Sequence, residues 1–156
     1  MSTQVTHHPA VAAWVGLVRA HAATTRRFNA QLVTDHGLTI NDYEVLLHLS
    51  QADGRRLRRV DLAERVLLTP SGITRLLEGL EQCGYVERAS CASDARVTYA
   101  QLTDDGFAKL REASRSHVAE IREYMGGRFS DDELEALGSL LERLPVDPPD
   151  GLECGV

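Results

Sequence analysis

The sequence lacks the marks of membrane, secreted and metal-binding proteins. No apolar run approaches the roughly 20 residues needed to cross a bilayer, which excludes a membrane-spanning helix. The N-terminus has no basic segment followed by an apolar one, as a secretory signal would have, so we expect a cytoplasmic protein. Three cysteines without paired spacing give no indication of a disulfide framework or a CxxC-type zinc site.

Signatures of catalysis are also missing. The sequence shows no nucleophile with an evident base, no glycine-rich phosphate loop and no cluster of carboxylates. Its six histidines have no recognised metal-ligand spacing. We therefore expect neither an enzyme, nor a cofactor, nor a bound metal.

The length and charge fit one domain with an uneven charge distribution. A chain of 156 residues can bury a core without cross-links. The net charge is -6, but residues 1–52 hold three basic and three acidic residues, 53–100 hold eight and seven, and 101–156 hold six and thirteen. Within 53–75, six arginines stand against three acidic residues. A phosphate backbone responds to such a local excess rather than to the total charge.

Apolar residues at spacings of three and four predict a series of helices. The first three are expected over 10–33, 41–52 and 60–66. Thr69 followed by Pro70 predicts the start of a fourth helix, over 70–83. A threonine oxygen can cap free amides there, and proline at the first helical position gives up only an N–H that had no partner.

After Gly84 the pattern changes from helical to alternating. Residues 85–89 and 97–102 are rich in β-formers and flank a polar loop, which predicts an antiparallel hairpin. Thr103 is expected to cap a long helix that runs to about residue 126, and the sequence from Ser130 to Glu133 is a capping box for a last helix. The apolar face of that last helix holds Leu134, Leu137, Leu140, Leu141 and Leu144. Three prolines then end ordered structure, so we expect a flexible tail over 145–156.

Two short helices joined by a tight turn and followed by a hairpin are the order of a winged helix-turn-helix. We therefore expect a mainly α fold with a small two- or three-stranded β wing. Helix 70–83 would be the recognition helix, because a helix fits the major groove and presents polar residues of its N-terminal half to base edges. That half holds Ser71, Thr74 and Arg75.

The combination of motifs resembles the MarR family of bacterial transcriptional regulators, over nearly all of residues 10–144. The matching segments are Leu38-Thr39, Val60-Asp61-Leu62-Ala63-Glu64-Arg65, Ser71-Gly72-Ile73-Thr74-Arg75-Leu76-Leu77, Leu80-Glu81-Gln82-Cys83-Gly84-Tyr85-Val86-Glu87-Arg88, Asp94-Ala95-Arg96 and Leu102-Thr103-Asp104-Asp105-Gly106. The resemblance implies a homodimeric regulator of a palindromic DNA site. It implies one domain over 1–156, with dimerisation helices over 10–35 and 104–144 and a DNA-binding winged helix-turn-helix over 40–102.

The resemblance also assigns roles in the wing. Arg96 would enter the minor groove while Asp94 holds its guanidinium, which reduces the freedom that the arginine loses on binding. The family more often has an arginine between the two, and here it is Ala95, so we expect fewer phosphate contacts per wing. The alternative for Asp94 and Arg96 is a surface ion pair across a turn.

Two further arginines are candidates for phosphate contacts, each with a simpler alternative. Arg58 belongs to a basic stretch that also contains Arg55, Arg56 and Arg59 and that could be a solvated loop. Arg88 could be an exposed charge on a strand.

Members of the family commonly bind a small anionic or aromatic effector between the dimer-forming helices and the DNA-binding module. The resemblance therefore implies a repressor that such an effector releases, through a difference in affinity for two arrangements. Trp14, His21, Tyr43 and His48 are the candidates, because each can stack on or hydrogen-bond a carboxylated ring. The alternative is a structural role, with Trp14 in the dimer core and the histidines buried and satisfied.

Two other functions stay open at this point. Some relatives sense oxidants through cysteine, and Cys91 on the wing loop is the residue that could be exposed here. A winged-helix adaptor that binds protein rather than DNA would carry the same fold, and for such an adaptor Arg75 and Arg96 would be dispensable.

Overall fold

The structure is a computed structural model and describes residues 8–144. The chain forms two compact units, residues 1–40 and 41–156, and each is described by itself. The expected flexible tail over 145–156 lies outside the described residues.

The first unit consists of helix α1 (Pro9–His36), which extends the helix expected over 10–33. The side chain of His8 accepts a hydrogen bond from the N–H of Ala10 at its start. The helix ends at Gly37, whose φ of 67° is in the left-handed region that glycine adopts without strain. Large apolar side chains on α1 are exposed to water, at 65% for Trp14 and 45% for Val18.

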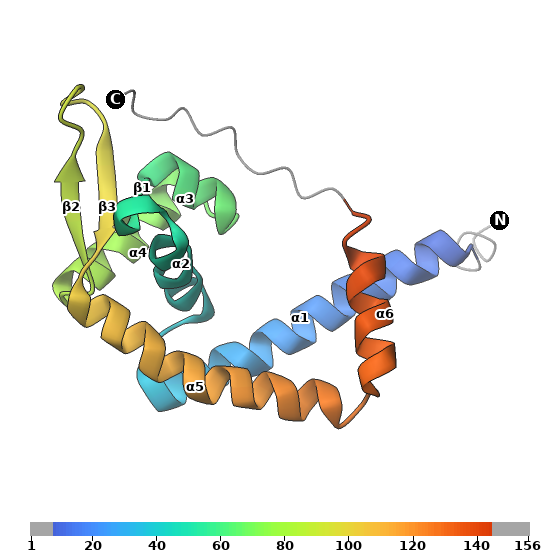
Figure 1. Cartoon of the computed structure of the whole chain (residues 1–156). Coiled ribbons are helices and arrows are strands. Elements are labelled where there is room, and N and C mark those ends of the chain that lie inside the picture. The colour runs from blue at the N-terminus through green and yellow to red at the C-terminus, as the bar shows by residue number, and fades with distance from the viewer. Residues whose placement is uncertain (1–7, 145–156) are drawn as a thin grey trace. The chain divides into compact units, whose positions relative to one another are not determined.

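The second unit is a winged helix-turn-helix followed by two further helices (Figure 1). Its elements are α2 (Ile40–Gln51), the 3-10 turn η2 (Asp53–Arg55), β1 (Arg56–Arg58), α3 (Arg59–Arg65), α4 (Pro70–Gln82), β2 (Val86–Ser90), β3 (Thr98–Leu102), α5 (Asp104–Gly126) and α6 (Asp131–Leu141). Fully buried leucines and a valine from three helices form the centre of this unit: Val45, Leu46, Leu49, Leu62 and Leu77. The mainly α fold with a small wing is confirmed.

The wing is a three-stranded antiparallel sheet in the order β1-β3-β2. In the hairpin, Val86 pairs with Leu102 and Ser90 pairs with Thr98, as the alternating pattern predicted. The third strand, β1, lies where the sequence suggested a solvated loop, and its Leu57 pairs with Ala100. The loop alternative is wrong for Arg56 and Arg58, because the strand forms only through pairing with a segment some forty residues away.

The helix starts follow their local signals. Thr69 accepts a hydrogen bond from the N–H of Gly72 at 3.1 Å, and Thr103 accepts one from Gly106 at 3.0 Å. The capping box of Ser130 and Glu133 is formed in both directions. Each of these residues satisfies amides that have no partner within the helix.

Gly106 allows the start of α5 to lie directly against the start of the wing. A Cβ at this position would lie 2.0 Å from the carbonyl oxygen of Tyr85 and 2.8 Å from Cδ1 of Leu102. Next to it, the Thr103 hydroxyl donates to the carbonyl of Gly84 at 2.6 Å, and the Thr103 N–H donates to Tyr85 O at 3.1 Å. The contact between α5 and the hairpin is therefore a backbone contact.

The leucine face of α6 is not buried within the described chain. No residue of α6 is buried, and Leu140 is 54% exposed. Just beyond the helix, Leu144 is 51% exposed. The amphipathic helix predicted from the sequence is confirmed. The apolar face of this helix is exposed to water within the described chain. Within residues 8–144, no helix is long and apolar enough to span a membrane.

Candidate nucleic-acid interface

The first group of candidate residues lies at the N-terminal half of α4. Ile73, Leu77 and Leu80 are the buried residues of this helix, and the polar side chains lie on its other face. Arg75 is exposed, and within the described residues no hydrogen bond or ion pair engages its guanidinium. The five N–H donors of Arg75 are therefore available to a ligand.

The two hydroxyls near Arg75 are oriented by the start of the helix. Thr74 donates from Oγ1 to the carbonyl of Pro70 at 2.9 Å, which leaves its oxygen as an acceptor. Ser71 is exposed, with Oγ 3.2 Å from Oγ1 of the cap residue Thr69. The free amides of a helix start and a neighbouring hydroxyl are groups that bind phosphate oxygens.

The second group lies at the end of the wing. Asp94 accepts hydrogen bonds from the backbone N–H of Arg96 at 3.0 Å and from its Nε at 3.2 Å. The backbone hydrogen bond, and after it the side-chain bond, lowers the pKa of Asp94. The carboxylate that holds Arg96 is therefore charged at neutral pH, and the contact would be lost only as pH falls below this lowered pKa.

The Arg96 side chain is 92% exposed while its Nε is held by Asp94. This is the contact that the resemblance implied for Asp94 and Arg96. The alternative, a surface ion pair across a turn, would have the same geometry but no DNA-binding role. An arginine that is extended into solvent and held at one nitrogen retains Nη1 and Nη2 for a partner. The role of Arg96 in a DNA groove stays a prediction.

Arg58 is engaged within the chain. Its Nε and Nη2 donate to the two carboxylate oxygens of Asp61, at 2.9 Å and 2.8 Å. This bidentate hydrogen bonding raises the pKa of Arg58. Its side chain is 19% exposed, so any phosphate contact would use the remaining nitrogen.

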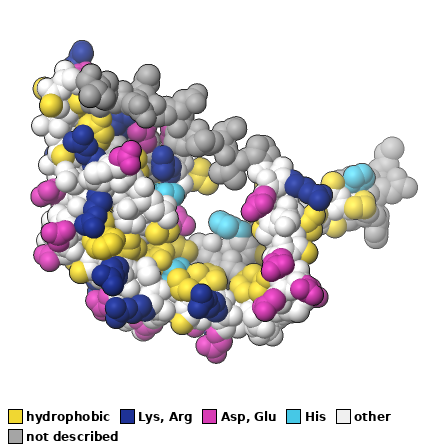
Figure 2. Space-filling view, viewed as in Figure 1, with side chains coloured by type: hydrophobic (Ala, Val, Ile, Leu, Met, Phe, Trp, Pro, Cys, Tyr) yellow, Lys and Arg dark blue, Asp and Glu magenta, His cyan; other side chains and the backbone are white. Residues whose placement is uncertain are grey.

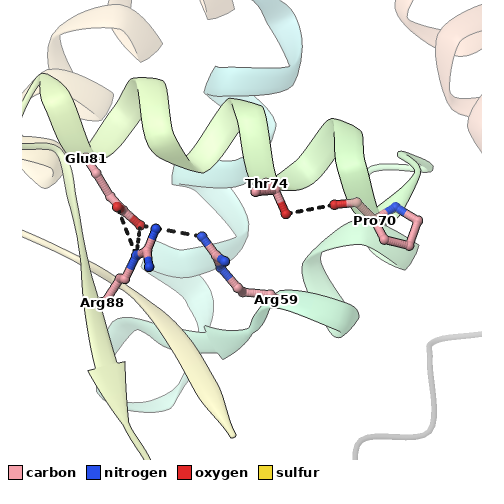
Figure 3. A network of polar contacts seen from close by, with 5 residues as sticks. All are labelled: Arg59, Pro70, Thr74, Glu81 and Arg88. Carbon is pink, nitrogen blue, oxygen red and sulfur yellow. Dashed lines mark hydrogen bonds and ion pairs between the residues drawn. The ribbon is translucent and has the colours of Figure 1, made fainter. Parts of the chain in front are cut away.

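Arg88 is also paired within the chain, with Glu81 of α4 (Figure 3). Its Nε lies 3.2 Å and 3.1 Å from the two Glu81 oxygens. Arg59 approaches the same carboxylate, with Nη2 3.7 Å from Oε1. This cluster could not be predicted from the sequence, because its three members come from α3, α4 and β2 and share no local spacing.

A cavity of about 320 Å³ brings the start of α3 together with the wing. It is lined by Arg58, Arg59, Val60, Arg96, Val97 and Thr98. Arg58 and Arg59 thus line one cavity together with Arg96, which is about forty residues further along the chain. Figure 2 shows basic side chains over this part of the chain and at the free end of the wing. The local positive charge expected over 53–75 is continued by Arg96, although the whole chain is acidic.

The four candidates for an effector site lie in two different units. Trp14 and His21 are exposed on α1. Tyr43 of α2 is 8% exposed, its hydroxyl lies 3.1 Å from Oγ of Ser114, and its ring meets that of His117 edge-on.

His48, also on α2, is half-buried. Burial lowers its pKa, and the charge of Arg65 lowers it further. The imidazole is therefore neutral at pH 7 and can both donate and accept hydrogen bonds.

Cys91 is not the exposed thiol that its place on the wing loop suggested. Its side chain is 6% exposed, with Sγ 3.1 Å from Oγ of Ser93. Cys83, at the end of α4, is exposed, and Cys154 lies outside the described residues.

Sequence comparison finds transcriptional regulators over most of the chain. The sequence model of the MarR family matches residues 36–97. The HTH-type transcriptional repressor YetL of Bacillus subtilis is 35% identical over 114 residues, which are 70% of this chain and 68% of YetL. The HTH-type transcriptional regulator MhqR of the same organism is 30% identical over 134 residues, 86% of this chain and 90% of MhqR.

Structure comparison agrees. A MarR family regulator of Streptomyces coelicolor, solved in complex with DNA, is 30% identical with a TM-score of 0.76, over 84% of this chain and 82% of that one. AbsC, another regulator of that organism and family, is 30% identical with a TM-score of 0.75, over 85% of this chain and 88% of AbsC. From its fold, its exposed basic residues and these relatives, the chain belongs to the MarR family of DNA-binding transcriptional regulators and is not an enzyme.

Proposed function

We propose that this protein is a cytoplasmic homodimeric repressor that binds a palindromic operator and is released by a small aromatic or anionic effector. The observation that carries the DNA-binding part is the pair of exposed arginines in the helix-turn-helix and the wing. Arg75 has no partner in the described chain, and Arg96 is 92% exposed while Asp94 holds its Nε. Both are presented to a ligand rather than used to hold the fold together.

In this proposal α4 lies in the major groove and the wing reaches the minor groove. Arg75 would read base edges, with Thr74 and Ser71 binding a base or a nearby phosphate. Arg96 would enter the minor groove, where A·T-rich sequence makes the groove narrow and strongly negative. Arg58 and Arg88 each already hold a carboxylate of the chain, so each would contact phosphate only through the nitrogens that its carboxylate leaves free.

The test is a fluorescence-anisotropy titration of the purified protein against the intergenic DNA beside its own gene, with competitor DNA and varied salt. Sequence-selective binding that weakens with salt is expected, because lysine and arginine release counterions from the phosphates they contact. Arg75→Ala should reduce the preference for that DNA over competitor by about tenfold. An adaptor would show no selective binding there or to other genomic fragments.

The homodimer is supported by the apolar side chains that the chain leaves exposed on two helices. On α1 these include Trp14 and Val18, and on α6 they include Leu137 and Leu140. A second copy would present the same residues, so a two-fold symmetric contact could cover each of them. The two winged modules of such a dimer would read two half-sites of opposite direction, which is the reason for expecting a palindrome.

Leu140→Asp is expected to weaken the dimer without unfolding the chain, because this side chain is 54% exposed before association. Burying a leucine is favourable by roughly 1.5–3 kcal/mol and the change occurs in both copies, so the dissociation constant should rise at least about 100-fold. Light scattering coupled to size exclusion measures it. Ser139→Asp adds the same charge at an exposed polar position of α6 and should leave the dimer intact. A fully dimeric Leu140→Asp variant would contradict this assignment.

The effector proposal rests on the chemistry of Trp14, His21, Tyr43 and His48. Trp14 is the one tryptophan of the sequence, so tryptophan fluorescence reports on this residue alone. A panel of aromatic carboxylates is titrated into the protein and into its DNA complex. A compound that changes the fluorescence and also lowers DNA affinity supports the proposal. Compounds that release DNA equally well from His21→Ala and His48→Ala variants would contradict the roles of these two residues.

A further inference from the structure

Glu81 joins three elements of the DNA-binding module through one carboxylate (Figure 3). It lies in the last turn of α4, and Arg88 of β2 donates from Nε to both of its oxygens. Arg59, the first residue of α3, lies 3.7 Å away on its other side. The recognition helix, the helix before it and the wing therefore meet at Glu81.

A carboxylate is electrostatically unfavourable at this end of a helix, where the free carbonyls carry negative partial charge. No basic residue of α4 lies in its last turn, so the compensation comes from the two arginines of other elements. The side chains of Glu81 and Arg59 are each 23% exposed. Partial shielding from water makes their attraction stronger than that of a surface ion pair.

Arg59 depends on this carboxylate. Its Nη2 is buried and makes no hydrogen bond within the described residues. An arginine nitrogen without a hydrogen bond is costly to bury unless a counter-charge lies near. Loss of the negative charge of Glu81 would therefore favour movement of Arg59 away from its present place.

Ile73, Leu77 and Leu80 form the buried face of α4 and pack it into the core of the unit. At the C-terminal end of the helix, Glu81 adds a directional charged contact to both neighbouring elements. Glu81 lies ten residues from Ser71, which is about 15 Å along a helix. If α4 tilts about its contacts at Glu81, the displacement therefore grows along the helix and is largest at Ser71.

We propose that Glu81 is a positioning residue which, by binding Arg59 and Arg88 together, sets the angle of α4 relative to the wing. The inference rests on the DNA-binding function proposed above. Base contacts by Arg75 and the groove contact of Arg96 must form on one DNA site at once, so this angle determines sequence selectivity more than overall affinity. The simpler role, a negative charge that repels DNA, predicts that a neutral variant binds every DNA more tightly and keeps the same sequence selectivity.

The test compares Glu81→Gln with Glu78→Gln. Both variants remove one negative charge from α4, but Glu78 is exposed and has no ion pair within the described residues. Anisotropy measures binding to a duplex recovered by in vitro selection with the wild-type protein and to a duplex of scrambled order. The quantity compared is the ratio of the two affinities.

Glu78→Gln should strengthen binding to both duplexes and leave the ratio within about twofold of wild type, since charge acts on all phosphates alike. Glu81→Gln should lower the ratio at least about fivefold, the loss expected when one base contact is misplaced. A ratio that is unchanged or increased in Glu81→Gln overturns the inference. If the wild-type protein binds both duplexes equally, the proposed function fails as well, so the two failures are distinguishable.

Arg88→Gln provides a second measurement that does not depend on the folding of Glu81→Gln. It should lower the ratio to a similar extent, and the double variant should be no worse than the single ones if the pair acts as one unit. Independent losses that multiply in the double variant would overturn the inference. A thermal unfolding curve of each variant separates loss of position from loss of the fold.

Discussion

Arg96→Ala is expected to lower affinity for the selected DNA by about tenfold or more and to flatten the salt dependence of binding. The side chain lies at the end of the wing, is 92% exposed and is held by Asp94 through its Nε. Within the described residues its guanidinium makes no hydrogen bond or ion pair other than the one with Asp94. The magnitude of the slope of log affinity against log salt should decrease by about 0.9 for each wing whose arginine no longer neutralises a phosphate.

The control for Arg96→Ala is Arg111→Ala on α5. Arg111 is also an exposed arginine without a partner in the described residues, so the variant loses the same charge outside the proposed interface. Its affinity and salt slope should stay close to wild type. An unchanged slope in Arg96→Ala would contradict the groove contact, and the ion pair with Asp94 would then be a surface feature only.

Asp94→Asn separates the holding of Arg96 from its charge. Asparagine can still accept the hydrogen bond from the Arg96 N–H, but it no longer attracts the guanidinium. If Asp94 acts by restricting Arg96, this variant loses affinity although it removes a negative charge from the interface. A gain in affinity would show that repulsion of DNA is the larger effect of Asp94.

Gly106→Ala is expected to destabilise the protein by about 3 kcal/mol, the upper range for overpacking. The added Cβ would lie 2.0 Å from the Tyr85 carbonyl oxygen, and this neighbour is backbone that cannot move without shifting the hairpin. Thermal unfolding should show a midpoint lowered by about 6–12 °C for a chain of this size. The variant should also lose DNA affinity in proportion to the displacement of the wing.

Gly79→Ala is the matched control, with the opposite expected sign. Gly79 lies within α4, and nothing lies within 4 Å of the position of its Cβ. Alanine in a helix interior is favoured over glycine by about 1 kcal/mol, so this variant should be slightly more stable than wild type. A Gly106→Ala variant as stable as wild type would mean that α5 and the hairpin separate easily and do not form one rigid contact.

The features that the sequence predicted well depend on neighbouring residues. The caps of α4, α5 and α6 are Thr69, Thr103 and Ser130, because each side chain accepts a hydrogen bond from the amide only three positions further on. The hydrogen-bonded ion pair of Asp94 and Arg96 is equally local, because the two residues are two positions apart. Helix spans are set by apolar spacing, which is also a property of one segment.

What the sequence could not predict depends on segments that meet only in the fold. β1 is three residues long and exists through pairing with β3, and a run this short has no recognisable alternation. The same holds for Glu81, whose two arginines come from α3 and β2. Tyr43 of α2 is buried against Ser114 and His117 of α5, about seventy residues further along the chain.

The leucines of α6 show which property follows from local sequence and which depends on tertiary structure. Their spacing determines that the helix has one apolar face, because 3.6 residues per turn place them on the same side. The spacing is the same whether that face meets the chain's own core or a second copy. By itself the sequence determined the helices, their caps and the polar half of the recognition helix, since these follow from local geometry. The tertiary structure alone decided which charges are paired, which are exposed and which apolar faces remain open, since these depend on long-range packing.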